Sequence, residues 1–151
     1  MRILVVDDEW VSREKIKKIM ESLGQCFGVE GGEAALEAFG AAWGILEPYD
    51  LILLDVDMPG LSGIETLKKI RGKEQEMGLA APALVKVVMI TSMSGSAVVK
   101  EALDAGCNDY IIKPVKKLLI TEKLQPLFPP EITRSWQGAP TFNGSSIEVV
   151  E

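Results

Sequence analysis

The sequence predicts an α/β domain built on a doubly wound, five-stranded parallel sheet with helices on both faces. Short apolar segments alternate five times with stretches of helical periodicity, and such alternation is typical of parallel sheets with right-handed crossovers. The apolar segments also end abruptly at polar residues. Because the carboxyl ends of parallel strands lie together, these polar residues should meet in one crevice.

Each strand is predicted from a short apolar segment. The first is rich in β-branched residues, as expected of a central strand that is buried on both faces. The third contains the unbroken apolar run Leu51–Leu54 and stops at Asp55. The five expected strands are Met1–Val6, Gln25–Val29, Tyr49–Leu54, Val85–Ile90 and Cys107–Ile112.

The intervening helices are predicted from apolar residues three and four positions apart. Gly24 and Gly106 end the first and fourth helices, and Pro126 ends a short fifth helix. The third helix is expected to fray from Gly72 to Gly78. The helical spacing is carried by Ile16, Ile19 and Met20; by Ala35, Leu36 and Phe39; by Ile64, Leu67 and Ile70; by Val98, Val99 and Ala102; and by the segment Lys116–Leu124.

Two parts of the chain differ in character. Residues 1–125 form the predicted domain, and residues 126–151 are expected to be a C-terminal tail with little regular structure. Proline and glycine interrupt the tail repeatedly, which disfavours helices and strands. It could dock only through Trp136, Phe142 and the segment Ile147–Val150.

Composition argues against several classes of protein. The chain has 16 basic and 22 acidic residues, a net charge of −6, which argues against direct binding to nucleic acid or to an anionic membrane. Neither a membrane span nor a signal peptide is evident, so a cytoplasmic protein is expected. Cys26 and Cys107 lack metal-binding spacing and are expected to be buried free thiols. Without histidine, the chain can supply neither a histidine base nor a phosphohistidine.

The predicted strand ends carry residues suited to phosphoryl chemistry. Carboxylates are ligands for Mg²⁺, and a lysine and a hydroxyl can bind phosphoryl oxygens. Each residue alone has a simpler interpretation, such as a helix N-terminus for the first acidic pair. Their joint placement predicts a pocket for phosphoryl transfer onto a carboxylate. The residues are Asp7, Asp8, Asp55, Thr91 and Lys113.

This combination resembles the receiver domain of bacterial two-component response regulators. The resemblance covers about residues 1–125 and implies the flavodoxin-like strand order 2-1-3-4-5, of which the family is a known example. The motifs that carry it are Val5–Glu9, Leu54–Gly60 together with Gly63, Met89–Ser92 and Asp109–Pro114.

The resemblance implies that Asp55 accepts a phosphoryl group from the phosphohistidine of a histidine kinase or a histidine phosphotransfer protein. It implies that Mg²⁺ is bound by Asp8, Asp55 and the backbone carbonyl of Asp57, with Asp7 acting through water. Met58, Pro59 and Gly60 would form a supporting turn.

The resemblance also implies a conformational switch. Lys113 would pair with the phosphoryl oxygens, Thr91 would move to bond the phosphoryl group, and Tyr110 would swing inward into the space that Thr91 leaves. These movements would reshape the face formed by the fourth helix, the fifth strand and the fifth helix. That face would meet a downstream protein target or a second copy of the chain.

Two alternatives compete with this interpretation. Asp55-Val56-Asp57 also resembles the nucleophile motif of haloacid-dehalogenase-type aspartyl phosphatases, although there the acidic pair follows the motif, whereas here Asp7-Asp8 precedes it. The chain could instead be the receiver fragment of a longer regulator with an output domain. Residues 131–151 resemble no DNA-binding helix pair, which favours a stand-alone regulator.

Overall fold

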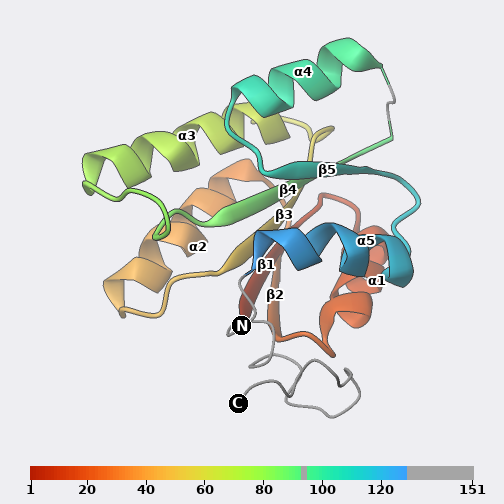
Figure 1. The fold of residues 1–151 in the computed structure, drawn as a ribbon, viewed down its shortest axis with the longest axis horizontal. Coiled ribbons are helices and arrows are strands. Elements are labelled where there is room, and N and C mark those ends of the chain that lie inside the picture. The colour runs from red at the N-terminus through yellow and green to blue at the C-terminus, as the bar shows by residue number, and fades with distance from the viewer. Residues whose placement is uncertain (93–94, 129–151) are drawn as a thin grey trace.

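The predicted sheet and its strand order are confirmed. The structure is a computed structural model that describes residues 1–92 and 95–128. These residues form one parallel sheet in the order β2-β1-β3-β4-β5 (Figure 1). The elements are β1 (Arg2–Val6), α1 (Trp10–Met20), β2 (Gln25–Val29), α2 (Gly32–Gly44), β3 (Leu51–Asp55), α3 (Gly63–Glu76), β4 (Lys86–Thr91), α4 (Ser96–Asp104), β5 (Asp109–Ile112), α5 (Lys117–Leu124) and the 3-10 helix η1 (Gln125–Leu127).

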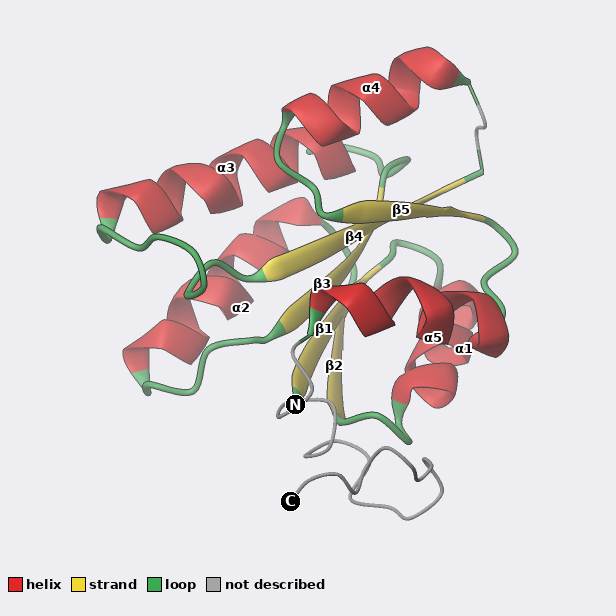
Figure 2. Ribbon diagram, in the orientation of Figure 1, coloured by secondary structure: helices red, strands yellow, loops and turns green. Residues whose placement is uncertain are grey.

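Helices cover both faces of the sheet and enclose a separate core on each (Figure 2). On one face, α2, α3 and α4 pack side chains such as Phe39, Leu67 and Ala102 against the sheet. On the other face, α1 and α5 contribute Met20 and Ile120. β1, β3 and β4 lie inside the sheet and are almost entirely buried, which explains their unbroken apolar sequences.

The register of the strands brings their carboxyl ends to one edge. Val6 pairs with Leu54 across β1 and β3, Asp55 pairs with Ile90 across β3 and β4, and Thr91 pairs with Ile112. The polar residues at the ends of these strands are therefore neighbours in space, as the sequence predicted.

The expected fraying of α3 from Gly72 is wrong, because the helix continues to Glu76. Its first turn is held by a capping box, in which Ser62 accepts the Glu65 N–H and the Glu65 carboxylate accepts the Ser62 N–H. Its last turns are held by the buried carboxylate of Glu74. These contacts outweigh the roughly 1 kcal/mol that a glycine costs inside a helix.

Glu74 and Arg71 tie the end of α3 to the neighbouring strands. Glu74 accepts the Val85 N–H at 2.7 Å and an Arg71 N–H at 2.7 Å. Arg71 also donates to the carbonyls of Val85 and Gly106 and to the side chain of Asn108. This network lies beside the amino ends of β4 and β5, away from the acidic residues.

The packed chain continues past α5. η1 follows without a break, and the side chain of Phe128 is buried in the core that α1 and α5 share. The rest of the expected tail, including Trp136 and Phe142, lies outside the described residues. Of the two free thiols, Cys107 is buried as expected, but Cys26 is only half-buried. No helix of the described residues is long and apolar enough to cross a membrane.

Candidate phosphoryl-transfer site

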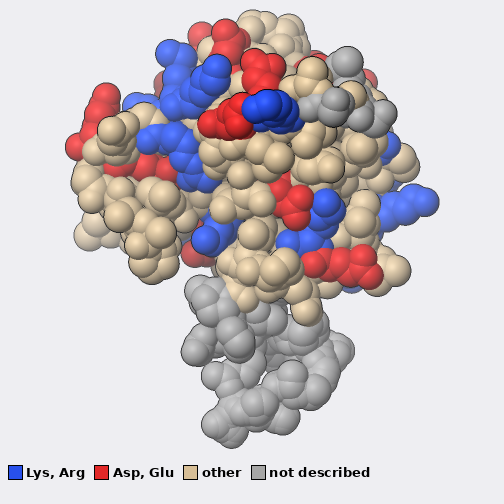
Figure 3. Space-filling model, turned by 45° about the horizontal axis from the view of Figure 1, so that its top comes forward, with Lys and Arg blue, Asp and Glu red and all other residues tan. Residues whose placement is uncertain are grey.

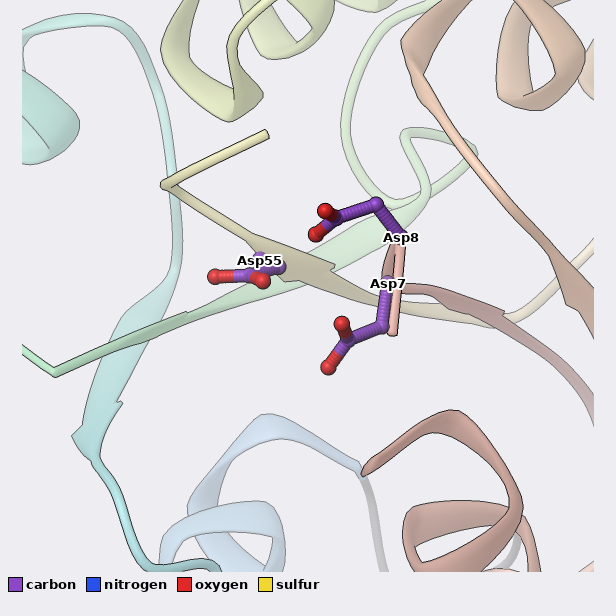
Figure 4. A group of neighbouring side chains, drawn as sticks. All are labelled: Asp7, Asp8 and Asp55. Carbon is purple, nitrogen blue, oxygen red and sulfur yellow. The ribbon is translucent and has the colours of Figure 1, made fainter. Parts of the chain in front are cut away.

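Three carboxylates converge at the carboxyl edge of the sheet. Asp7 and Asp8 follow β1 directly, and Asp55 is the last residue of β3. Each offers an oxygen that lies within 4.8 Å of those of the other two. Figure 4 shows the three side chains extending from their two strands around a shared space. The structure thus brings together the three acids that the sequence singled out.

Asp7 is fixed by hydrogen bonds from the residues that begin α1. One of its carboxylate oxygens accepts the Glu9 N–H at 2.9 Å, and the other accepts the Ser12 hydroxyl at 2.6 Å. Arg13 donates to the Asp7 carbonyl at 2.9 Å. Neither Ser12 nor Arg13 was predicted from the sequence, although their position in the first turn after an acidic pair could have suggested that they orient it.

Asp55 is buried, with 4% of its surface exposed. One of its carboxylate oxygens accepts the Asp57 N–H at 3.2 Å, and the other accepts a hydrogen bond from Lys113 at 3.4 Å. Burial raises the pKa of Asp55 to about 6, and the nearby Asp7 also raises it, whereas Lys113 and the Asp57 N–H act in the opposite direction. A buried carboxylate with a raised pKa is typical of a functional site.

Lys113 lies between two of the acids. Its ammonium is 3.4 Å from Asp55 Oδ2 and 3.6 Å from Asp7 Oδ2. Burial lowers the pKa of Lys113, but the charges of Asp55 and Asp7 outweigh that effect, so its pKa is raised. The lysine therefore brings a fixed positive charge to the edge of the carboxylate cluster.

Thr91 and Asp57 complete this edge. Thr91 is the last residue of β4 and is 1% exposed, and its carbonyl accepts the Lys113 N–H at 2.8 Å. The side chain of Asp57 is exposed and accepts a long hydrogen bond of 3.5 Å from Ser92. Thr91 thus contacts Lys113, and Asp57 contacts Ser92, at the strand ends that were predicted to form the pocket.

The turn after Asp55 is shaped by glycines. Met58 is buried in the core, Pro59 is exposed, and Gly60 has a φ of 76°, a conformation that favours glycine. The first residue of α3, Gly63, packs directly against β3, where a Cβ would collide with the carbonyl oxygen of Asp55. The sequence Met58–Gly63 thus lets the helix begin immediately beside the acidic residue.

Tyr110 occupies a different part of the sheet edge. It lies in β5, is partly buried, and packs against the core under α2, α3 and α4. Its ring also faces the ammonium of Lys123, 4.7 Å from the ring centroid. Lys123 was not predicted from the sequence, because only the tertiary structure brings α5 next to β5.

The donor set fits a Mg²⁺ ion. Mg²⁺ prefers oxygen ligands and is commonly bound by one or two carboxylates together with waters and substrate phosphate. Asp7, Asp8 and Asp55 provide three carboxylates in one place. Asp8 is exposed while the other two are buried, so the cluster borders on solvent.

Acidic and basic side chains are mixed on one face of the molecule. On the face drawn in Figure 3, lysine and arginine side chains lie next to aspartate and glutamate side chains. On α4, Lys100 and Asp104 form an exposed ion pair.

Comparison with known proteins shows the family of this chain. Residues 3–125 match the family described as the response regulator receiver domain. A chemotaxis protein CheY homolog of Campylobacter jejuni is 34% identical over 128 residues, which cover 83% of this chain and 90% of the relative. A cyclic di-GMP phosphodiesterase of Thermotoga maritima is 33% identical over 125 residues, but these cover only 30% of that longer protein.

A solved structure shows the same fold. The complex of CheX and CheY with BeF₃ and Mg from Borrelia burgdorferi matches with a TM-score of 0.72 and 23% identity. The match covers 85% of this chain and 90% of the solved one. The arrangement of helices around the sheet is therefore shared with that structure.

Proposed function

Because the chain belongs to the response regulator receiver domain family, we propose that it accepts a phosphoryl group on Asp55 and passes the signal on by changing shape. The observation that carries this proposal is the environment of Asp55. Its buried carboxylate lies beside the carboxylates of Asp7 and Asp8 and beside the ammonium of Lys113. The family resemblance implies that the donor is the phosphohistidine of a histidine kinase or histidine phosphotransfer protein. Because this chain contains no histidine, the donor would be another molecule.

In the proposed reaction, a carboxylate oxygen of Asp55 attacks the phosphorus atom of the donor. The bond between phosphorus and the imidazole nitrogen breaks, the imidazole leaves with its electron pair, and an aspartyl phosphate forms. Lys113, already beside Asp55 Oδ2, would stay with the phosphoryl oxygens and neutralise their charge. Ser12 and the Glu9 N–H hold Asp7 in place throughout.

A bound Mg²⁺ would supply positive charge that offsets the charge of the acids and of the phosphoryl oxygens. Asp8 and Asp55 are the proposed direct ligands, together with the Asp57 carbonyl, and Asp7 is proposed to act through water. The three clustered carboxylates support this assignment. The CheY of the Borrelia burgdorferi complex was crystallised with Mg and BeF₃.

The output is proposed to be a change in the face formed by α4, β5 and α5. Thr91 would bond the phosphoryl group, and Tyr110 would turn inward. That face would then meet a downstream protein or a second copy of the chain. The proposal places the protein in the cytoplasm.

The test uses acetyl phosphate and Mg²⁺, with intact mass and phosphate release followed together. We expect one phosphoryl group per chain to accumulate on Asp55, with acetate as the leaving group. Asp55→Asn should take up none. Asp104→Asn, which removes an exposed carboxylate from α4, should be labelled as the wild type is.

The same experiment distinguishes the receiver function from the alternative of an aspartyl phosphatase. An aspartyl phosphatase would release phosphate over many turnovers without accumulating label, because the acid two residues after the nucleophile would act as its general acid and base. The proposal would be wrong if the wild type behaved in that way, or if Asp55→Asn were labelled at the wild-type rate.

A further inference from the structure

A contact between α5 and β5 has no part in the phosphoryl chemistry. The ammonium of Lys123 lies 4.7 Å from the centroid of the Tyr110 ring and donates a 3.1 Å hydrogen bond to Asp109 Oδ1. The same oxygen accepts the Tyr110 N–H at 2.8 Å. Lys123 therefore contacts the ring of Tyr110 and also the carboxylate that holds the Tyr110 backbone.

Lys123 makes this contact around the edge of the sheet. It belongs to α5, which packs on the face that contains Ile120 and Leu124, whereas Tyr110 packs against the core on the opposite face. β5 is the edge strand, and Figure 1 shows α5 on one side of it and α4 on the other. The lysine thus links the two layers at the strand that carries Tyr110.

The charges around the ring favour this arrangement. A cation over the face of a tyrosine ring is attracted by the electrons of the ring. Asp109 adds an ion pair whose two side chains are each 28% exposed. The position of Lys123 in the last turn of α5 also suits the partial negative charge at the end of a helix.

We infer that Lys123 is a positioning residue that restrains the Tyr110 ring in its present place beside the ammonium and so sets how readily the unphosphorylated protein switches. This inference rests on the proposed function, in which the Tyr110 ring turns inward when Thr91 bonds the phosphoryl group. Such an inward turn would carry the ring away from the ammonium. Removing the ammonium should therefore raise the fraction of molecules whose Tyr110 ring is turned inward before any phosphorylation. The coupling between the position of the ring and the phosphorylation of Asp55 is reciprocal.

The two tyrosines of the chain, Tyr49 and Tyr110, allow a direct measurement. Incorporating 3-fluorotyrosine gives two ¹⁹F resonances, and Tyr49→Phe identifies the one from Tyr110. With Mg²⁺ and no phosphodonor, Lys123→Met should shift the Tyr110 resonance toward its position in the phosphorylated wild type. The inward population should rise about two- to five-fold. Lys123→Arg should restore the wild-type position, because a guanidinium can stack on the ring and pair with Asp109.

Lys18→Met is the matched control. Lys18 is an exposed lysine in the last turn of α1, so the substitution removes the same charge from an equivalent position in another helix. It should leave the Tyr110 resonance unchanged. Asp109→Asn removes the ion pair but keeps the lysine, so it should shift the Tyr110 resonance in the same direction as Lys123→Met but by less. It replaces Lys123→Met in the experiment if that variant does not fold.

Intact mass after acetyl phosphate treatment separates this inference from the proposed function. If the wild type takes up no phosphoryl group, the proposed function fails. If it does, and Lys123→Met or its substitute Asp109→Asn leaves the Tyr110 resonance where the wild type has it, the restraint by Lys123 is refuted. An equal shift in Lys18→Met would refute it too, because the effect would then come from net charge.

Discussion

The surroundings of Asp55 act on its pKa in opposite directions. Its burial disfavours the ionised form and is the largest cause of its raised pKa of about 6, yet only the ionised form can attack phosphorus. Lys113 and the Asp57 N–H favour ionisation, and a bound Mg²⁺ would favour it further. The proposed nucleophile therefore depends on its neighbours for its charge, which makes the metal-free protein sensitive to pH.

The metal-free protein should lose stability as the pH rises through about 6. The folded pKa of Asp55 lies above its value of 3.8 in the unfolded chain, so its contribution is fully present below about pH 4 and lost above about pH 6. The loss amounts to at most about 3 kcal/mol. Asp55→Asn should abolish it, so urea unfolding with EDTA should show the variant gaining on the wild type between pH 4 and 8.

Asp104→Asn serves as the control for this experiment, because Asp104 is an exposed acid in α4. Its difference from the wild type should stay nearly constant between pH 4 and 8. The raised pKa of Lys113 does not interfere, because its contribution is present below pH 10.5 and is lost only at higher pH. A difference for Asp55→Asn that stays flat over this range would contradict the prediction.

At the scale of elements, the junction between β3 and α3 determines where Asp55 lies. The Gly63 N–H donates to the Val56 carbonyl at 3.0 Å, and the capping box of Ser62 and Glu65 sets the direction of the helix. The helix can approach the strand this closely because Gly63 has no side chain. Gly63 is thus required because only a glycine lets α3 begin this close to Asp55.

Gly63→Ala should destabilise the protein by about 3 kcal/mol, because its Cβ would collide with the backbone of Asp55 and force the strand and helix apart. It should also slow labelling by acetyl phosphate, since the displaced atoms adjoin the nucleophile. Denaturant unfolding and intact mass measure the two effects.

Gly72→Ala is the internal control, since a Cβ at this position in the same helix meets no atom within 4 Å. It should stabilise the protein by about 0.5–1 kcal/mol, because alanine favours helix more than glycine does. Equal effects of the two substitutions would show that Gly63 has no special packing role.

At the scale of the whole molecule, the sheet separates two hydrophobic cores. The last described residue, Phe128, covers part of the core on the face of α1 and α5. Phe128 is 6% exposed and shares this core with Leu23, Leu124 and Ile3. It follows η1, which contains Pro126. The proline ends α5 as predicted, but the packed chain goes on for one more turn.

Phe128→Ala should lower the free energy of unfolding by about 3 kcal/mol, because it removes a buried aromatic side chain and leaves a cavity. Phe128→Leu should recover much of this loss, since leucine refills part of the space. Leu118→Ala changes an apolar residue of α5 that is 74% exposed and should have little effect. If Phe128→Ala and Leu118→Ala unfold at the same urea concentration, the side chain of Phe128 does not contribute to the core.

Much of this protein could be predicted from its sequence. Parallel strands buried on both faces require continuous apolar segments, and those segments end where the strands end, so the amino-acid sequence alone locates Asp7, Asp55 and Thr91 at one edge of the sheet. The approach of Lys113 to the acids followed from the same rule. The strand order came from the family resemblance, because local periodicity carries no information about which strands are neighbours.

Tertiary structure alone decided the rest, because the relevant partners are far apart in the chain. Glu74 lies in the part of α3 that was expected to fray, and its buried carboxylate accepts the N–H of Val85, which is eleven residues further along the chain. Lys123 contacts the ring of Tyr110 only because the fold brings α5 next to β5. The raised pKa of Asp55 depends mainly on burial by the folded chain. Sequence shows where polar groups leave the strands, but only the packed chain determines what surrounds them.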